Sequence, residues 1–230
     1  AAAYTSYGVR LASHGFVVVM RDDPGVLTNT STEADDIAFV VSTWLPQQNA
    51  DAQSPLFGLV DTTRIGLAGH SRGGKASAVA AEHGAKGLVR AWFGLDPIDA
   101  SAVSGGVFAV TDMADIAIPI AMIGASVSSS CSPVGTNSDV LFDAATAPAV
   151  QIVGVGAGHT QLEDSDACFA CAACAPAGTA DGDVVLAYSL RYLTAFFARE
   201  LLDDASVGAT FEGAGALGGV AAGLVVVNAK

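Results

Sequence analysis

The chain has 230 residues, 51% of them hydrophobic, which is enough apolar content for a globular domain to fold without metals or partners. Its 23 acidic residues outnumber its 10 basic ones and give a formal net charge of −13. Such a surface repels phosphates, which argues against nucleic acid as a partner and against electrostatic binding to anionic membranes.

Strand-like apolar runs alternate along the chain with helix-like runs. This pattern predicts an α/β fold with a mostly parallel sheet flanked by helices. In chain order we expect a helix (about 2–13), a strand (15–20), a helix (32–46), a strand (64–69), a helix (72–84), three strands (88–95, 118–124 and 149–155) and a helix (183–202).

The chain is expected to form a single domain over residues 1–230, with its core at about 4–202 and a C-terminal extension over 203–230. Within that extension, residues 213–227 are uncharged but rich in glycine. This run is shorter than the roughly 20 residues that a membrane-spanning helix needs. We therefore expect a final strand or a packed tail there, and no integral membrane segment.

Residues 69–74 read Gly-His-Ser-Arg-Gly-Gly and hold the most informative motif of the chain. A G-x-S-x-G sequence between a strand and a helix is typical of the nucleophile elbow of α/β-hydrolases. Gly69 and Gly73 are expected because side chains two residues from the serine would collide with the strand and the helix. The turn would expose the Ser71 hydroxyl and direct the backbone N–H of Arg72 toward a developing oxyanion. The alternative is a glycine-rich turn whose serine has no special role.

A nucleophilic serine needs a histidine as its base, and the chain has four histidines. His70 lies inside the elbow and is expected to point away from the serine. His14 and His83 each precede a glycine after a helical stretch, where an imidazole is ordinary helix-end chemistry. His159 instead follows a strand-like run and a glycine-rich loop late in the chain, which fits the order serine, acid, histidine. We expect His159 to be the base, against the alternative of a surface-loop histidine.

The acid of the site is harder to predict. The strand at 118–124 is followed by no carboxylate, whereas the strand at 88–95 leads directly into Asp96-Pro97-Ile98-Asp99. Asp96 therefore has the better position to orient the imidazole and to stabilise its protonated form. Asp99 is the second candidate, and a turn aspartate beside a proline is the alternative for both.

Several segments together resemble one family: Gly-His-Ser-Arg-Gly-Gly-Lys at 69–75, Gly-Leu-Asp-Pro-Ile-Asp at 94–99, Gly-His at 158–159, Leu-Ala-Ser-His-Gly-Phe-Val-Val-Val at 11–19, and Cys-Ser-Pro at 131–133. They are similar to the chlorophyllase-like branch of the α/β-hydrolases. That branch groups with bacterial serine esterases and, more distantly, with polyester hydrolases and platelet-activating-factor acetylhydrolases. The resemblance covers about residues 4–202. It implies Ser71 as nucleophile, Asp96 as acid and His159 as base.

The chain departs from this family at its front end. The family supplies a second oxyanion N–H from a His-Gly loop that follows an early strand and precedes the first helix. Residues 1–12 already read as that helix, and His14-Gly15 precedes a strand rather than following one. We therefore expect the N-terminal strands to be missing, with an open sheet edge beside the strand at 15–20. Either the sequence is a fragment, and further N-terminal residues would complete the oxyanion site, or the sheet is smaller than is usual in the family.

The four cysteines are Cys131, Cys168, Cys171 and Cys174. The last three form C-x-x-C-x-x-C, which permits a zinc or iron–sulfur site with Cys131 as the fourth ligand. An even count in an acidic hydrolase favours two disulfides instead, and free thiols are the third possibility. Sequence cannot choose among the three pairings. We expect one bridge between the Cys131 loop and the loop after His159.

The sequence thus predicts a serine carboxylic-ester hydrolase with a Ser71, His159 and Asp96 triad and with the Arg72 N–H as oxyanion donor. No metal and no organic cofactor are expected. The substrate would be a small-molecule or polymeric ester, and the protein a secreted or periplasmic monomer. The alternatives are a polyester or lipase-like hydrolase, or a non-catalytic binding protein with the same fold.

Overall fold

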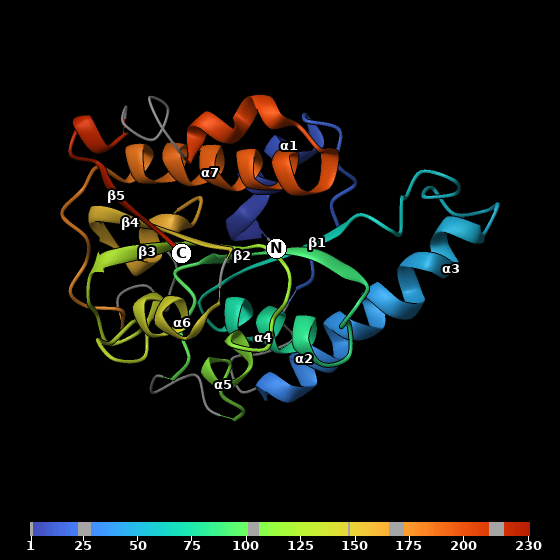
Figure 1. Cartoon of the computed structure of the whole chain (residues 1–230), viewed down its shortest axis with the longest axis horizontal. Helices are drawn as coiled ribbons and strands as arrows, with labels where there is room; N and C mark the ends of the chain where they lie inside the picture. The colour runs from blue at the N-terminus through green and yellow to red at the C-terminus, as the bar shows by residue number, and fades with distance from the viewer. Residues whose placement is uncertain (1, 23–28, 101–105, 147, 166–172, 212–218) are drawn as a thin grey trace.

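The computed structural model describes residues 2–22, 29–100, 106–146, 148–165, 173–211 and 219–230. Five strands form one sheet in the order β1-β2-β3-β4-β5. The first four strands run parallel, and the last pairs antiparallel with its neighbour. The strands are β1 (Ile65–His70), β2 (Val89–Leu95), β3 (Ile120–Val127), β4 (Ala149–Gly158) and β5 (Val225–Ala229). The predicted mostly parallel α/β sheet is confirmed (Figure 1).

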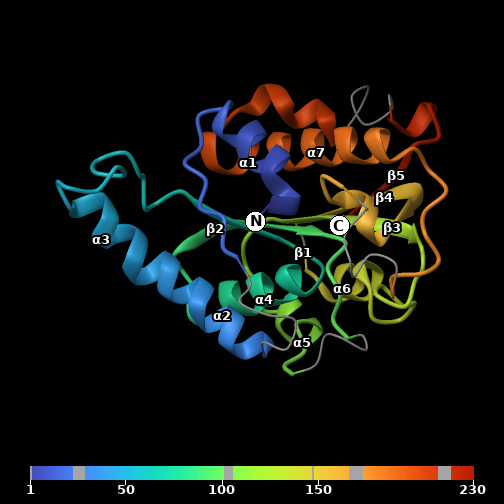
Figure 2. The ribbon, with the colours of Figure 1, turned by 180° about the vertical axis from the view of Figure 1, so that it is seen from behind.

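Helices cover both faces of the sheet, as Figures 1 and 2 show. One face carries α1 (Thr5–Ala12) and α7 (Gly182–Leu202). The other face carries α2 (Thr30–Phe39), α4 (Ser71–Glu82), α5 (Val110–Met113) and α6 (Ser138–Ala144). Helix α2 continues through a π-helical turn, η2 (Val40–Trp44), into α3 (Leu45–Ala50). Short 3₁₀ turns are η1 (Ala2–Tyr4), η3 (His159–Leu162) and η5 (Ala205–Thr210).

Alternate side chains of β2 fill two apolar clusters on opposite faces of the sheet, as the two-residue period of a strand requires. Phe93 packs against Phe196 and Phe197 of α7. Trp92 points to the other face, where its indole N–H donates to Ser77 Oγ of α4 over 2.9 Å. The two clusters hold the sheet rigidly between its helices, and this fixes the strand ends from which the site is built.

The predicted strand at 15–20 is wrong. These residues form no β-strand in the structure, and the side chains of Val17 and Val19 are 44% and 43% exposed. An apolar run becomes a strand only when it finds a hydrogen-bonding neighbour, and residues 15–20 pair with none of the five described strands. β1 lies at one edge of the sheet that the described residues form.

The other predicted elements are found with shifted ends. The predicted helix at 32–46 begins at Thr30, because the side chain of Asn29 accepts a hydrogen bond from the Ser31 N–H over 3.0 Å and caps the helix. It runs on to Ala50 through the π-helical turn, and Pro46 occupies the first turn of α3, where a missing N–H costs little. The C-terminal extension contributes the final strand β5.

Candidate active site

Ser71 stands at a sharp turn between β1 and α4. Its backbone has φ of +55°, a left-handed conformation that is rare for a non-glycine residue. The two glycines that this turn requires are Gly69 and Gly74. A Cβ on Gly69 would lie 2.3 Å from the Gly73 carbonyl oxygen, and one on Gly74 would lie 2.8 Å from the Gly69 carbonyl oxygen. The expectation for Gly73 was wrong, because a Cβ there would have no atom within 4 Å.

A continuous chain of hydrogen bonds joins Ser71, His159 and Asp96. His159 Nε2 lies 2.9 Å from Ser71 Oγ, and His159 Nδ1 lies 2.6 Å from Asp96 Oδ2. A carboxylate can only accept, so Nδ1 carries the hydrogen and Nε2 presents its lone pair to the serine hydroxyl. This is the tautomer in which an imidazole can take a proton from a serine.

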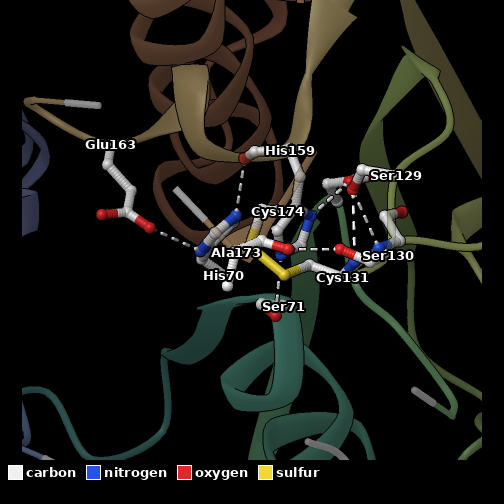
Figure 3. Close-up of a disulfide and its surroundings, with 11 residues drawn as sticks. His70, Ser71, Ser129, Ser130, Cys131, His159, Glu163, Ala173 and Cys174 are labelled. Carbon is white, nitrogen blue, oxygen red and sulfur yellow. Dashed lines mark hydrogen bonds and ion pairs between the residues drawn. A yellow bond between two sulfur atoms is a disulfide. The ribbon is translucent and has the colours of Figure 1, made fainter. Parts of the chain in front are cut away.

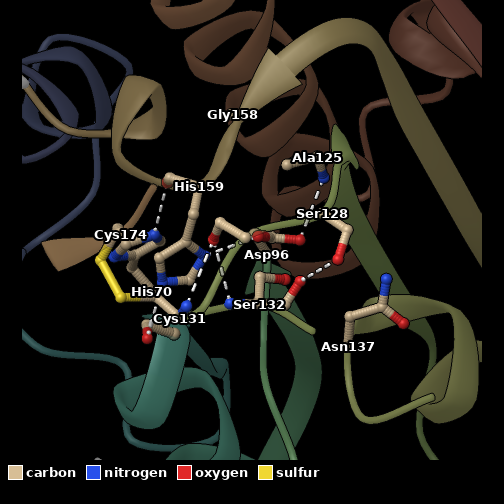
Figure 4. Close-up of polar contacts among 12 residues, drawn as sticks. His70, Asp96, Ala125, Ser128, Cys131, Ser132, Asn137, Gly158, His159 and Cys174 are labelled. Atoms are coloured by element: carbon tan, nitrogen blue, oxygen red, sulfur yellow. Dashed lines mark hydrogen bonds and ion pairs between the residues drawn. A yellow bond between two sulfur atoms is a disulfide. The ribbon is translucent and has the colours of Figure 1, made fainter. Parts of the chain in front are cut away.

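These three residues come from the carboxyl ends of three parallel strands. Ser71 follows β1, Asp96 follows β2 and His159 follows β4. Asp96 is fully buried, and its second oxygen, Oδ1, accepts from the backbone N–H of Ala125 over 3.0 Å (Figure 4). Its carboxyl group is thus held on both oxygens, whereas Ser71 remains half-buried and open to a substrate.

The competing aspartates lie elsewhere. Asp99 Oδ1 accepts from the backbone N–H groups of Ala109 and Val110, over 2.6 and 3.3 Å. Burial raises the pKa of the Asp99 carboxyl above its usual range. A third aspartate, Asp139 of α6, is also engaged away from His159, because its Oδ1 accepts from the side-chain amide of Gln151 over 2.8 Å. The structure therefore brings Asp96, and not Asp99, to His159.

A family model described as Chlorophyllase matches residues 1–183. The chain belongs to the chlorophyllase family. Membership places it among the α/β-hydrolases and in the ester-hydrolase class. A comparison with curated proteins finds no match.

In this chlorophyllase-family chain, Arg72 directly follows the serine and has two distinct parts. Its guanidinium pairs with Glu33 of α2, through Nε to Oε2 at 3.2 Å and Nη2 to Oε1 at 2.8 Å. Glu33 is 2% exposed, so this pair fixes the side chain against α2. The backbone N–H of Arg72 belongs to the first turn of α4, the positive end of the helix dipole beside Ser71.

His70 also belongs to the site, which the sequence did not predict. Its ring lies against that of His159, with ring centroids 4.5 Å apart. Its Nε2 lies 3.0 Å from the His159 backbone carbonyl oxygen (Figure 3). Its Nδ1 lies 2.6 Å from the hydroxyl of Tyr4. These partners are 89 and 66 residues distant along the chain, and no motif in the sequence links them.

One disulfide borders the site. It joins Cys131, in the loop after β3, to Cys174, in the segment after His159. The Ser130 N–H donates to the Ala175 carbonyl oxygen over 3.0 Å, and the Ser130 hydroxyl donates to the Ala173 carbonyl oxygen. Hydrogen bonds therefore connect the same two segments as the disulfide does. The predicted bridge between these two loops is confirmed, and a metal site with Cys131 as ligand is ruled out in this oxidised form. Cys168 and Cys171 lie outside the described residues.

No helix in the described parts of this chlorophyllase-family chain combines the length and the apolar character needed to span a bilayer.

Proposed function

We propose that the chain is a serine carboxylic-ester hydrolase that works through an acyl-enzyme, with Ser71 as nucleophile, His159 as general base and Asp96 as the acid that orients it. The observation that carries this proposal is the hydrogen-bonded chain from Ser71 Oγ through His159 to Asp96. The ester-hydrolase class of the chlorophyllase family supports it. Ester hydrolysis by these three residues needs neither a metal nor an organic cofactor.

Acylation begins when Ser71 Oγ attacks the ester carbonyl carbon and its proton passes to His159 Nε2, 2.9 Å away. The imidazolium that forms is stabilised by the Asp96 carboxylate at 2.6 Å, which stays ionised throughout. Collapse of the tetrahedral intermediate breaks the bond to the alcohol oxygen, and the alcohol leaves with the proton that His159 returns. The acyl group is then bound to Ser71 as an ester.

Deacylation repeats the same steps with water. His159 Nε2 takes a proton from a water molecule, whose oxygen attacks the acyl carbon. The second tetrahedral intermediate collapses, Ser71 Oγ regains its proton from His159, and the carboxylic acid leaves. One residue thus serves as base and then as acid in each half of the cycle.

Both tetrahedral intermediates carry a negative charge on the former carbonyl oxygen. The backbone N–H of Arg72, in the first turn of α4, is our proposed donor to this oxyanion. The Arg72 side chain is fixed by Glu33, so the peptide that carries this N–H is held in place before substrate arrives. One such donor contributes about 10²–10³-fold to kcat in enzymes of this kind.

The ester-hydrolase class of the family makes an ester the expected substrate. The substrate would be a small-molecule or a polymeric ester, and a polyester or lipase-like activity is the alternative within the same class.

We also propose a single domain over residues 1–230 and a secreted or periplasmic monomer. The disulfide between Cys131 and Cys174 supports an oxidising compartment, because such bonds are reduced in most cytosols.

The experiment that tests the function is steady-state hydrolysis of p-nitrophenyl esters of graded acyl length. We expect saturable turnover by the wild type and a loss of about 10⁴-fold or more in kcat in Ser71→Ala. Ser13→Ala is the matched control, because Ser13 lies at the exposed end of α1. Full activity in Ser71→Ala would refute the proposal. A folded wild type that hydrolyses no ester would favour the non-catalytic binding protein.

A further inference from the structure

A tyrosine and a second histidine lie behind the proposed base. Tyr4 belongs to η1, His70 ends β1 and His159 begins η3, so three segments that are distant in the chain meet here. The Tyr4 hydroxyl lies 2.6 Å from His70 Nδ1, and His70 Nε2 lies 3.0 Å from the His159 backbone carbonyl oxygen. The His70 side chain is 5% exposed, so water does not compete for these contacts.

The hydrogen-bonding partners allow only one neutral tautomer of His70. A backbone carbonyl oxygen can only accept, so His70 Nε2 must carry a hydrogen. Burial, and then the neighbouring His159, lower the pKa of His70 to about 3, so the ring is neutral at ordinary pH. Its Nδ1 is then an acceptor, and the Tyr4 hydroxyl donates to it.

The carbonyl that His70 holds belongs to the residue whose ring must reach Ser71. The strand before it is held by hydrogen bonds at the end of β4, from the Gly156 N–H to Ser126 Oγ over 2.8 Å and from the Gly158 N–H to Gln161 Oε1 over 2.9 Å. The hydrogen bond from His70 adds a fixed point at the His159 carbonyl itself, and this limits how far the imidazole can swing away from Ser71 Oγ and Asp96 Oδ2.

We propose that His70 is a positioning residue, whose Nε2–H donates to the His159 carbonyl while its Nδ1 accepts from the Tyr4 hydroxyl, and which thereby holds the His159 backbone so that its imidazole stays aligned between Ser71 and Asp96. This role rests on the proposed function, because it takes His159 as the base. The close approach of the two rings, whose centroids are 4.5 Å apart, adds a second requirement. A neutral His70 tolerates the positive charge that His159 gains during the reaction, whereas a charged His70 would repel it.

The competing arrangement is a charged His70 paired with Glu163. Glu163 Oε1 lies 3.7 Å from His70 Nδ1, beyond hydrogen-bond distance, and burial raises the pKa of the Glu163 carboxyl. The other titratable groups around His70 are Tyr4, His159 and, through its charge, Asp96. The Tyr4 hydroxyl, at 2.6 Å, is therefore the hydrogen-bond partner of His70 Nδ1, and the Glu163 carboxylate, at 3.7 Å, is not.

The tautomer can be read directly by two-bond ¹H–¹⁵N NMR of protein labelled at its histidines, with the His70 signals assigned by their loss in His70→Gln. At pH 7 we expect a neutral ring protonated at Nε2. In Tyr4→Phe the donor to Nδ1 is gone while the His159 carbonyl still accepts from Nε2–H, so the ring should stay protonated at Nε2 and the Nδ1 signal should shift because that nitrogen loses its hydrogen bond. An Nδ1–H tautomer or an imidazolium in the wild type would overturn the proposal, and the imidazolium would support the Glu163 pair.

Tyr7→Phe is the matched control for Tyr4→Phe. The Tyr7 hydroxyl donates over 2.7 Å to the carbonyl oxygen of Leu162, at the end of the same turn η3, but does not touch His70. If Tyr4→Phe acted only by loosening the turn η3, the NMR signals of His70 would change in the same way in both variants. A shift of the His70 Nδ1 signal is expected in Tyr4→Phe alone, and an equal shift in Tyr7→Phe would refute the hydrogen bond from the Tyr4 hydroxyl to His70.

Kinetics of ester hydrolysis give the second readout. Tyr4→Phe and His70→Leu should each lower kcat about tenfold, the rate equivalent of one net hydrogen bond, with KM within about twofold of the wild type. In His70→Gln the amide nitrogen can reach the position of Nε2, so kcat should recover to within about threefold of the wild type.

The outcomes separate this proposal from the function on which it rests. Wild-type activity in Ser71→Ala would refute the serine hydrolase itself. An inactive Ser71→Ala together with wild-type kcat in His70→Leu and Tyr4→Phe would refute only the positioning role. If His70→Leu fails to fold, Tyr4→Phe and the wild-type NMR signals still decide the matter.

Discussion

The ammonium group of Lys75 lies 2.6 Å from the backbone carbonyl oxygen of Asp99, on the turn that begins with Asp96. Lys75 is fully buried on α4, one helical turn beyond Ser71, and its Nζ lies 5.4 Å from the centre of the Phe108 ring. The nucleophile's helix and the acid's turn are therefore tied together by a buried cation. Burial lowers the pKa of Lys75, and the nearby Asp99 carboxyl opposes this shift.

Lys75→Met should destabilise the protein by about 1–3 kcal/mol, because it removes a hydrogen bond from a charged donor and leaves a buried carbonyl unsatisfied. Lys86→Met is the matched control, since Lys86 pairs with Glu82 on the exposed surface and should change stability little. Urea unfolding monitored by circular dichroism measures both. Equal stability of the two variants would show that the buried contact contributes nothing net.

Asp96→Asn should lower kcat by about 10⁴-fold, because the amide stabilises the wrong imidazole tautomer and cannot stabilise the imidazolium. Asp99→Asn should be much milder, since its side-chain oxygen can still accept from the Ala109 N–H and does not touch His159. Steady-state kinetics with a p-nitrophenyl ester compare them. A larger loss in Asp99→Asn than in Asp96→Asn would reassign the acid.

Loss of the Cys131–Cys174 bridge should destabilise the protein by about 4 kcal/mol, from the chain entropy that a closed loop of 43 residues removes in the unfolded state. The double variant Cys131→Ser/Cys174→Ser measures this by urea unfolding. We also predict a second bridge between Cys168 and Cys171. Thiol titration of the unfolded, unreduced protein should find no free thiol, whereas two thiols would leave only the bridge to Cys131.

The lowered pKa of His70 predicts how the stability of the protein changes in acid. Its folded pKa of about 3 lies below the usual value of 6.5, so between these pH values the unfolded chain binds one more proton than the folded chain. Stability therefore rises with pH across this window and is lost as the pH falls below 6.5. Between pH 7.5 and pH 5 this contribution amounts to about 2 kcal/mol.

The acid effect is measured by comparing urea unfolding at pH 7.5 and pH 5 in the wild type and in His70→Gln. The glutamine cannot take up the proton, so the variant should lose less stability on acidification. His14→Gln, at an exposed histidine, should behave as the wild type does. An identical pH dependence in the wild type and in His70→Gln would refute a neutral, buried His70.

The three residues of the proposed triad could be predicted from the sequence because each one lies in, or directly follows, a recognisable local pattern. Ser71 lies in a strand–turn–helix motif, while Asp96 and His159 directly follow apolar runs whose carboxyl ends meet at one edge of a parallel sheet. Strand order did not need to be known for this. Only the type and direction of each strand mattered.

The errors and omissions depend on contacts between distant residues. The run at 15–20 has the composition of a strand, but a strand needs a neighbour, and composition does not reveal one. The crowding at Gly74 comes from the backbone of Gly69 and from Pro97, which lies beyond the next strand. The contacts of His70 with Tyr4 and His159 arise only when the chain has folded, so no local pattern predicts them.

The most direct test of the account is covalent labelling by a p-nitrophenyl alkylphosphonate, followed by mass spectrometry. Attack by Ser71 Oγ on phosphorus displaces p-nitrophenolate, and the serine proton passes to His159. We predict one phosphonyl group per chain, on the peptide that contains Ser71, with no labelling of Ser71→Ala and very slow labelling of Asp96→Asn. Stoichiometric labelling of Ser71→Ala, or a label on any other residue of the wild type, would contradict Ser71 as the nucleophile.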